Sequence, residues 1–158
     1  MGVLGRLGGL VRGGIRSALH GGSARARTGA VITDLSPEDH QRMERQRALV
    51  LAAARALFGT AGWTRSPADV AVLQRLLDED ALSDTASALP AVGVVLGDAV
   101  AGELGARWAA LFDDEATVVV LHAAGKTLDL CAVVVERGAR GGRVDLHAVM
   151  DEARAGLR

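Results

Sequence analysis

The residue types that could perform chemistry are few in this 158-residue chain, and the densest group lies in its second half. Three consecutive acids, Asp113, Asp114 and Glu115, are followed by His122 and later by His147. Carboxylates and imidazoles serve as general acids and bases in hydrolases, and they are common metal ligands. We treat these five residues as a candidate polar cluster for a small hydrolase or a ligand- or metal-binding domain.

The spacing of these residues argues against a metal site. The sequence contains neither a Cys-x-x-Cys pair nor a His-Glu-x-x-His helix, which are two common zinc-binding patterns. Consecutive side chains diverge in a strand or a turn, and a calcium loop needs oxygen ligands at alternate positions. The acidic triplet is therefore better explained as a solvated hairpin turn, and we expect no cofactor.

A thiolate nucleophile is the second chemical possibility, because Cys131 could act together with either histidine of the candidate cluster. Leu128, Leu130 and Val133 flank this cysteine, and apolar surroundings raise the pKa of a thiol and make it unreactive. The sequence also lacks a Gly-x-Ser-x-Gly elbow and a phosphate-binding loop. These observations favour a protein without catalytic activity.

Capping residues in the sequence predict the first two helices of the fold. Residues 36–39, Ser-Pro-Glu-Asp, open a helix that we expect to end at Gly59. Residues 66–69, Ser-Pro-Ala-Asp, open a second helix that ends near Asp80. Trp63 lies in the connection between them, where we expect it to fill a gap over the core.

The segment 90–103 is the expected central helix, around which the other elements pack. Its apolar residues recur at the spacing of a buried helical stripe, and they are Val92, Val95, Leu96, Ala99 and Val100. Pro90 suits the first helical position, and Gly105 suits the position after the last. A second face has no bulky side chain and lets another backbone approach closely; it consists of Gly93, Gly97 and Ala101.

Beyond this helix the periodicity changes from helix to strand. Alternating or β-branched residues predict three strands, at 107–112, 117–122 and 127–131. Their short connections favour an antiparallel meander. Residues 132–137 fit either a strand or a helix, and we favour a short helix. A last helix is expected to begin after Asp145, which suits the N-cap position.

The first 33 residues form a glycine- and arginine-rich arm that differs from the remainder. Apolar and basic side chains fall on opposite sides of a helical projection, and they include Leu4, Arg6, Leu7, Val11, Arg12 and Arg16. That pattern is typical of a basic amphipathic segment at an anionic membrane surface, here the inner membrane. Six glycines precede Ile15, each costing about 1 kcal/mol in a helix relative to alanine, and they favour a disordered tail instead. Both interpretations stay open.

Charge and composition limit the compartment and the partners. The arm holds five arginines and no acid, which leaves 13 basic and 19 acidic residues, a formal charge of −6, in residues 34–158. An acidic body argues against a nucleic-acid partner. The single cysteine fits a reducing compartment, and we find no apolar run near the roughly 18–20 residues that span a bilayer. The expected location is the cytoplasm, with the arm as a candidate membrane attachment.

Several phrases of the sequence together resemble a known family. They are residues 73–78, 93–98 and 103–105, Trp108 followed by the acidic triplet, and residues 144–146 before the last helix. In this order they resemble the bacterial domain-of-unknown-function family DUF3806, over about residues 73–157. The resemblance implies a domain that spans this range. It implies no catalytic residue, because the family has no reaction assigned.

These observations predict one α+β domain over residues 34–158, preceded by the loose arm. We expect three to four helices packed on one face of a small three-stranded antiparallel sheet. The expected function is a bacterial, non-enzymatic protein-binding module of the adaptor, chaperone-like or immunity type. Its partner is expected to be another protein, and its oligomeric state stays open. The alternative is the small hydrolase or ligand-binding domain that would use the candidate polar cluster.

Overall fold

Helices and strands form separate runs along the part of the chain that the computed structural model describes, residues 30–82, 85–112, 116–141 and 143–158. The helices in it are α1 (Pro37–Phe58), α2 (Ala68–Asp78), α3 (Thr85–Leu104), α4 (Leu130–Ala139) and α5 (Leu146–Leu157). The strands in it are β1 (Val31–Thr33), β2 (Arg107–Phe112), β3 (Thr117–Ala123) and β4 (Lys126–Leu128). The predicted α+β class is confirmed. The predicted arm, up to residue 29, lies outside the described residues.

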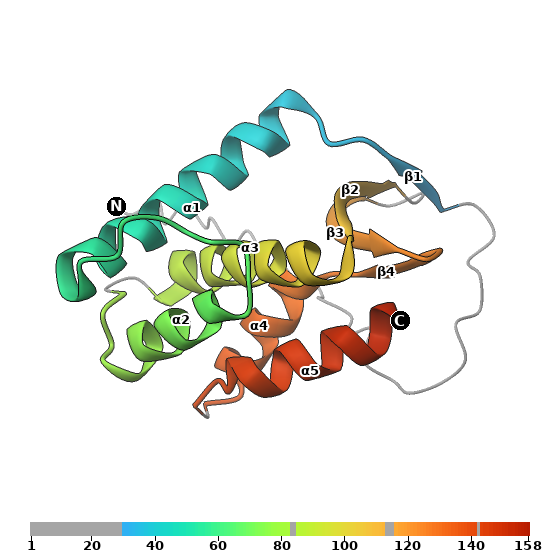
Figure 1. The fold of residues 1–158 in the computed structure, drawn as a ribbon. Coiled ribbons are helices and arrows are strands. Elements are labelled where there is room, and N and C mark those ends of the chain that lie inside the picture. Colours follow the sequence, from blue (N-terminus) through green and yellow to red (C-terminus); the bar gives the residue numbers. More distant parts are fainter. Residues whose placement is uncertain (1–29, 83–84, 113–115, 142) are drawn as a thin grey trace, which may run out of the picture.

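Helix α3 lies at the centre of the molecule and packs against α1, α2, α4 and α5 (Figure 1). All ten residues from 91 to 100 are buried, including the apolar stripe that the sequence indicated. The structure therefore confirms the central helix. Burial on nearly every side explains why this helix is apolar around most of its circumference.

Two expectations about this segment are wrong. Helix α3 begins at Thr85, so Pro90 lies inside the helix and not at its first position. Proline removes one helical hydrogen bond, but its neighbours Ala88, Leu89 and Ala91 are buried, and their packing favours the helix there. The expectation that no apolar run is long enough to span a bilayer is also wrong. Residues Ser87–Leu104 form an 18-residue stretch with a mean hydropathy of 1.4, which is long and apolar enough to cross a membrane. Of this stretch 67% is buried, as expected for a core helix.

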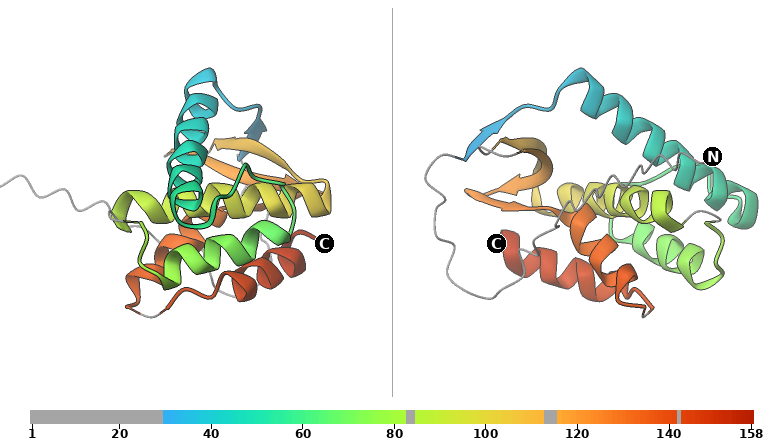
Figure 2. Two further views of the ribbon diagram at one scale, coloured as in Figure 1. Left: turned by 60° about the vertical axis from the view of Figure 1, so that its left-hand side comes forward. Right: turned by 180° about the vertical axis from the view of Figure 1, so that it is seen from behind.

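The four strands form one antiparallel sheet in the order β1-β2-β3-β4, beside the helices (Figures 1 and 2). Strands β2 to β4 are the predicted meander. Strand β1 is additional, since Val31 pairs with Phe112 and Thr33 pairs with Ala110. The sequence assigned residues 31–33 to the arm, because three residues are too few to show a strand period. The sheet therefore has four strands where three were expected.

The third predicted strand is shorter than expected, because a helix cap interrupts it. Strand β4 ends at Leu128, whereas the sequence suggested an end at Cys131. The carboxylate of Asp129 accepts a hydrogen bond from the backbone N–H of Ala132 at 2.9 Å and starts α4. Residues 132–137 are therefore helical, which was the favoured interpretation.

Side-chain caps define the ends of two other helices as the sequence indicated. Ser36 and Asp39 form a capping box at the start of α1, with each side chain accepting a hydrogen bond from the other residue's backbone N–H. Gly59 ends α1 in the left-handed conformation, with φ of 66°. Asp145 caps α5 by accepting a hydrogen bond from the backbone N–H of Ala148 at 3.0 Å.

Candidate functional site

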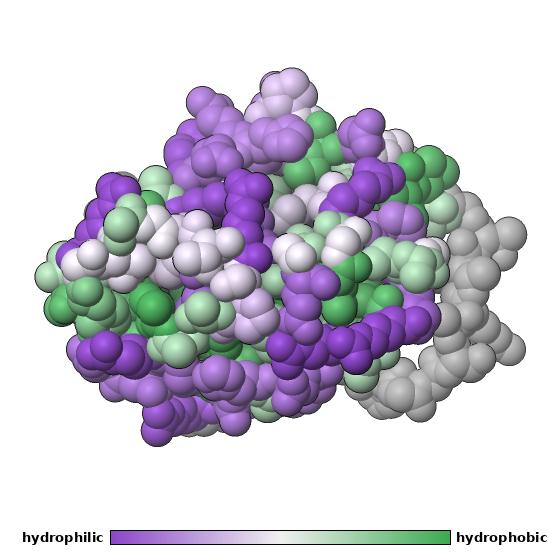
Figure 3. Space-filling view, viewed as in Figure 1, coloured by the Kyte–Doolittle hydropathy of each residue, from purple (hydrophilic) through white to green (hydrophobic). Residues whose placement is uncertain are grey.

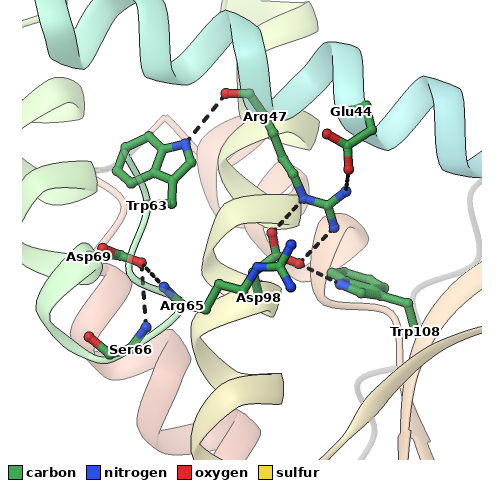
Figure 4. A network of polar contacts seen from close by, with 8 residues as sticks. All are labelled: Glu44, Arg47, Trp63, Arg65, Ser66, Asp69, Asp98 and Trp108. Carbon is green, nitrogen blue, oxygen red and sulfur yellow. Dashed lines mark hydrogen bonds and ion pairs between the residues drawn. The ribbon is translucent and has the colours of Figure 1, made fainter. Parts of the chain in front are cut away.

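A buried carboxylate, Asp98 of α3, joins three elements of the fold (Figure 4). Its side chain is 6% exposed. Arg47 of α1 donates two hydrogen bonds to it, from Nε at 2.6 Å and from Nη2 at 2.7 Å. The indole Nε1 of Trp108 in β2 donates a third at 2.8 Å. A buried charge without such partners costs several kcal/mol, so these bonds make Asp98 compatible with the core.

Arg47 extends this network toward the surface. Its Nη1 donates a hydrogen bond to the exposed carboxylate of Glu44 at 2.8 Å. The bonds to Asp98 raise the pKa of the Arg47 guanidinium above its ordinary value. The indole N–H of Trp63 donates to the backbone carbonyl of Arg47 at 3.4 Å, and its ring is half-buried against the core. The network therefore fastens α1 and the following connection to the central helix.

A second buried acid, Asp69 of α2, holds the connection between α1 and α2 in place. Its carboxylate accepts hydrogen bonds from the backbone N–H groups of Thr64 at 3.0 Å and Arg65 at 2.7 Å. Arg65 has a φ of 55°, and a Cβ added at Gly102 would lie 2.1 Å from its carbonyl oxygen. The connection therefore packs directly on α3, and α2 starts without a side-chain cap at Pro67.

The small-residue face of α3 contacts two different neighbours. A Cβ added at Gly93 would lie 2.7 Å from the Cα atom of Cys131 in α4. A Cβ added at Gly97 would lie 2.2 Å from Cζ2 of the Trp108 indole. Ala101 is partly buried and packs against the core. Gly93 thus lets the backbone of α4 pack closely on α3, and Gly97 does the same for the ring of Trp108.

The candidate polar cluster is only partly described. Asp113, Asp114 and Glu115 lie outside the described residues. His122 is half-buried in β3, with Nδ1 3.1 Å from the carbonyl oxygen of Lys126, and His147 is exposed in α5. Within the described ranges, no group of three or more His, Cys, Asp or Glu side chains is arranged to hold a metal ion.

Cys131 lies in the first turn of α4 and not in a strand. Burial raises the pKa of its thiol to about 12, and the negative charge of Asp129 contributes in the same direction. The thiol is therefore protonated at neutral pH. A protonated, buried thiol is a poor nucleophile.

A groove lies beside these residues, between α1, α3, β3 and α4. Its volume is about 330 Å³, within the usual range for ligand pockets. The lining residues come from all four elements, and they are Arg42, Met43, Gln46, Pro90, Val94, Thr117, Val118, Val119, Asp129, Cys131, Ala132, Val135 and Glu136. In the view from behind, α4 faces the reader below α1, with the sheet to one side (Figure 2).

The groove is mainly apolar, with charged side chains on its helices. Arg42 comes from α1 and is bound to Asp39 at 2.6 Å. Glu136 comes from α4 and Asp129 is the N-cap of that helix; we call them the acids of α4. The burial of Asp129, followed by the nearby charge of Glu136, raises the pKa of the Asp129 carboxyl. The two acids give this side of the groove a negative character. A smaller cleft of about 170 Å³ lies between α2 and α4, and Asp80 is the one acid among the described residues that line it.

Sequence reasoning missed both the Asp98 network and the groove. One signal was available, because Asp98 stands within an apolar helical stripe, where an acid needs a partner. The partner, Arg47, is 51 residues away in a different helix. The groove combines four elements that are distant in sequence, so no local pattern indicates it.

Comparisons with known proteins agree with this fold. The model of the family "Domain of unknown function (DUF3806)" matches residues 69–149, just over half of the chain. A 1.50 Å crystal structure from Bacteroides thetaiotaomicron VPI-5482 is similar with a TM-score of 0.71 and 16% sequence identity. The alignment covers 79% of this chain and 47% of that one, and at this identity it shows the fold alone. No curated protein matches. The chain belongs to the DUF3806 family.

Proposed function

We propose that this chain is a non-enzymatic protein-binding module of the adaptor, chaperone-like or immunity type, and that the groove is its binding surface. The observation that carries the proposal is the lining of the groove. Val118, Val119 and Val135 line the groove and are partly exposed, so they provide apolar surface, whereas the acids of α4 provide charge at one side. Apolar grooves with a few placed polar groups are a common way to bind a helix or an extended peptide.

Exposed apolar side chains next to the groove support a macromolecular partner. Val31 and Phe112 are 54% and 51% exposed, and they pair across β1 and β2. Phe112 also pairs with Thr117, which lines the groove. Figure 3 shows hydrophobic surface at the end of the molecule where β1 lies. The groove and this exposed pair together offer a larger surface than a small molecule needs.

The chemistry of the described acids and thiol also supports binding over catalysis. Asp98 and Asp69 form hydrogen bonds that hold helices and a connection together. Cys131 is protonated because its pKa is raised to about 12. The two carboxylates are held in hydrogen bonds within the fold, and the thiol is protonated. The groove, in contrast, offers apolar surface to a partner. We place the protein in the cytoplasm on the basis of its single cysteine.

Two substitutions on α4 test the proposal. Ala132 lines the groove, and Ala132→Gln places a longer side chain there while keeping a good helix former. Ala139 is exposed on the same helix outside the groove, so Ala139→Gln is the matched control. Wild type and both variants are used to isolate partners from extract of the host cell, and bound proteins are identified by mass spectrometry.

The expected result is at least one protein that binds wild type and Ala139→Gln and is lost with Ala132→Gln. The same set of proteins from all three forms would contradict the groove as the binding surface. The volume of the groove also fits a small-molecule ligand. Native mass spectrometry of the purified chain decides between these functions, since a co-purifying small molecule that Ala132→Gln excludes would support a ligand-binding domain.

A further inference from the structure

The first 29 residues match the groove in chemistry. Leu4, Leu7 and Val11 follow the i, i+3, i+7 spacing with which amphipathic helices enter apolar grooves. We propose that this N-terminal segment is the resident occupant of the groove, with these apolar side chains inside it and arginines near the acids of α4. The inference rests on the proposed function, because it assigns an occupant to the same binding surface.

The register of the sheet brings the segment close to the groove. Val31 pairs with Phe112, and Phe112 pairs with Thr117, a groove residue. Neighbouring strands lie about 4.8 Å apart, so Val31 is roughly 10 Å from Thr117. A random-coil linker of about fifteen residues spans roughly 20 Å, which is more than this distance. Residues 16–30 are therefore long enough to let Leu4, Leu7 and Val11 reach the groove.

The charges of the segment and the groove are complementary. The segment carries five arginines and no acid. On α4, Glu136 is one of the charges that disfavour ionisation of Asp129, and a cation beside both carboxylates stabilises their charged forms. An arginine of the segment would therefore add a favourable charge interaction on this side of the groove.

Docking within one chain has a consequence for the partner. A tethered segment is present at a millimolar effective concentration, so a partner that uses the same groove must displace it. The full chain would then bind its partner more weakly than a form whose segment cannot dock. The N-terminal segment would act as an internal competitor for the groove.

A paramagnetic label tests this inference in the full chain. Ser17→Cys is combined with Cys131→Ala, because Cys131 lines the groove and is only partly buried. The label then attaches to the segment alone, and Cys131→Ala treated with the same reagent is the control for labelling. The NMR signals to be measured are the methyl groups of Val94, Val119 and Val135 in the groove and of Val149 in α5.

The expected result is that the groove methyl signals lose most of their intensity while the Val149 signals keep theirs. Adding Leu7→Asp and Val11→Asp to the labelled chain should restore the groove signals. Equal intensity in both groups, or a loss that the two aspartates leave unchanged, would overturn the proposal. A loss that grows with protein concentration would assign the groove to the segment of a second copy, which also contradicts it.

A vesicle experiment separates this use of the segment from membrane attachment. Binding to vesicles of anionic phospholipid, combined with undiminished groove signals in solution, would make the segment a membrane anchor and overturn the proposal. Failure of this inference is distinguishable from failure of the proposed function. If Ala132→Gln still removes the partner, the groove is a binding surface and only its proposed occupant is wrong.

Discussion

Asp98 and Trp108 belong to the phrases through which the sequence resembles its family, and their side chains meet at 2.8 Å. Gly97 precedes Asp98 and leaves room for the indole, because a Cβ there would lie 2.2 Å from the ring. A helical glycine, the next acid and a strand tryptophan thus form one packed unit. Packing and hydrogen bonding explain the spacing of these three residues.

The first prediction concerns the charge of Asp98. Asp98→Asn keeps the shape of the side chain but leaves the guanidinium of Arg47 without its buried counter-charge. Breaking a buried ion pair costs about 3–5 kcal/mol, and we expect about 2–3 kcal/mol here because Arg47 also binds Glu44. Urea unfolding measures the loss in the free energy of unfolding.

The matched control is an exposed ion pair. Glu79→Gln removes the charge that faces Arg75 at 3.2 Å, where the two side chains are 47% and 60% exposed. Exposed pairs contribute about 0–1 kcal/mol, so this variant should unfold close to wild type. Similar stability losses in Asp98→Asn and Glu79→Gln would show that the Asp98 network does not support the core.

The second prediction concerns the thiol of Cys131. Its pKa is about 12 in the fold and near 9 in the unfolded chain, so above pH 9 the unfolded chain loses a proton that the folded chain keeps. Stability therefore falls as pH rises, by about 1.4 kcal/mol per pH unit between these values. The sequence has no tyrosine and a single lysine, so few other groups titrate there.

Urea unfolding at pH 8 and at pH 10 checks this prediction. Wild type should lose about 1.4 kcal/mol more than Cys131→Ala over this interval. Rapid alkylation of the native thiol at pH 8 would contradict the raised pKa of the Cys131 thiol, as would equal losses of stability in the two proteins.

At the scale of elements, α3 and α4 approach each other at a glycine. The third prediction is that Gly93→Ala destabilises the fold, because the added Cβ would lie 2.7 Å from the backbone of Cys131. Overpacking of this kind costs about 1–3 kcal/mol, and it opposes the gain of about 1 kcal/mol in helix propensity. Thermal unfolding measures the balance.

Gly156→Ala is the control for Gly93→Ala. Gly156 also lies in a helix, α5, but a Cβ there would meet nothing within 4 Å. The control should be as stable as wild type or slightly more stable, because alanine favours a helix. If Gly93→Ala behaves like the control, the two helices are not in backbone contact.

The elements that could be predicted are those with a local signal. Ser36 and Gly59 marked the ends of α1, and the period of residues 92–100 marked the central helix. The strand β1 has three residues and is defined only by its partner, so its sequence carried no period. The prediction that Pro90 is the first helical residue was wrong, because tertiary packing extends α3 on the N-terminal side of Pro90, back to Thr85.

At the scale of the whole molecule, the candidate site could not be predicted. Arg47 and Asp98 are 51 residues apart, and each looks ordinary within its own helix. The groove exists only after α1, α3, β3 and α4 have packed, and its lining includes residues from 42 to 136. The sequence could indicate which helix is central, but not which surfaces its neighbours leave open.

The central claim is that the groove, and not the candidate polar cluster, is the functional surface. The most direct measurement is the affinity of an isolated partner for the full chain with Ala132→Gln or Ala139→Gln on α4. We predict at least a tenfold loss for Ala132→Gln, about 1.4 kcal/mol, with unchanged affinity for Ala139→Gln. Equal affinity of both variants, each folded as wild type, would contradict the account.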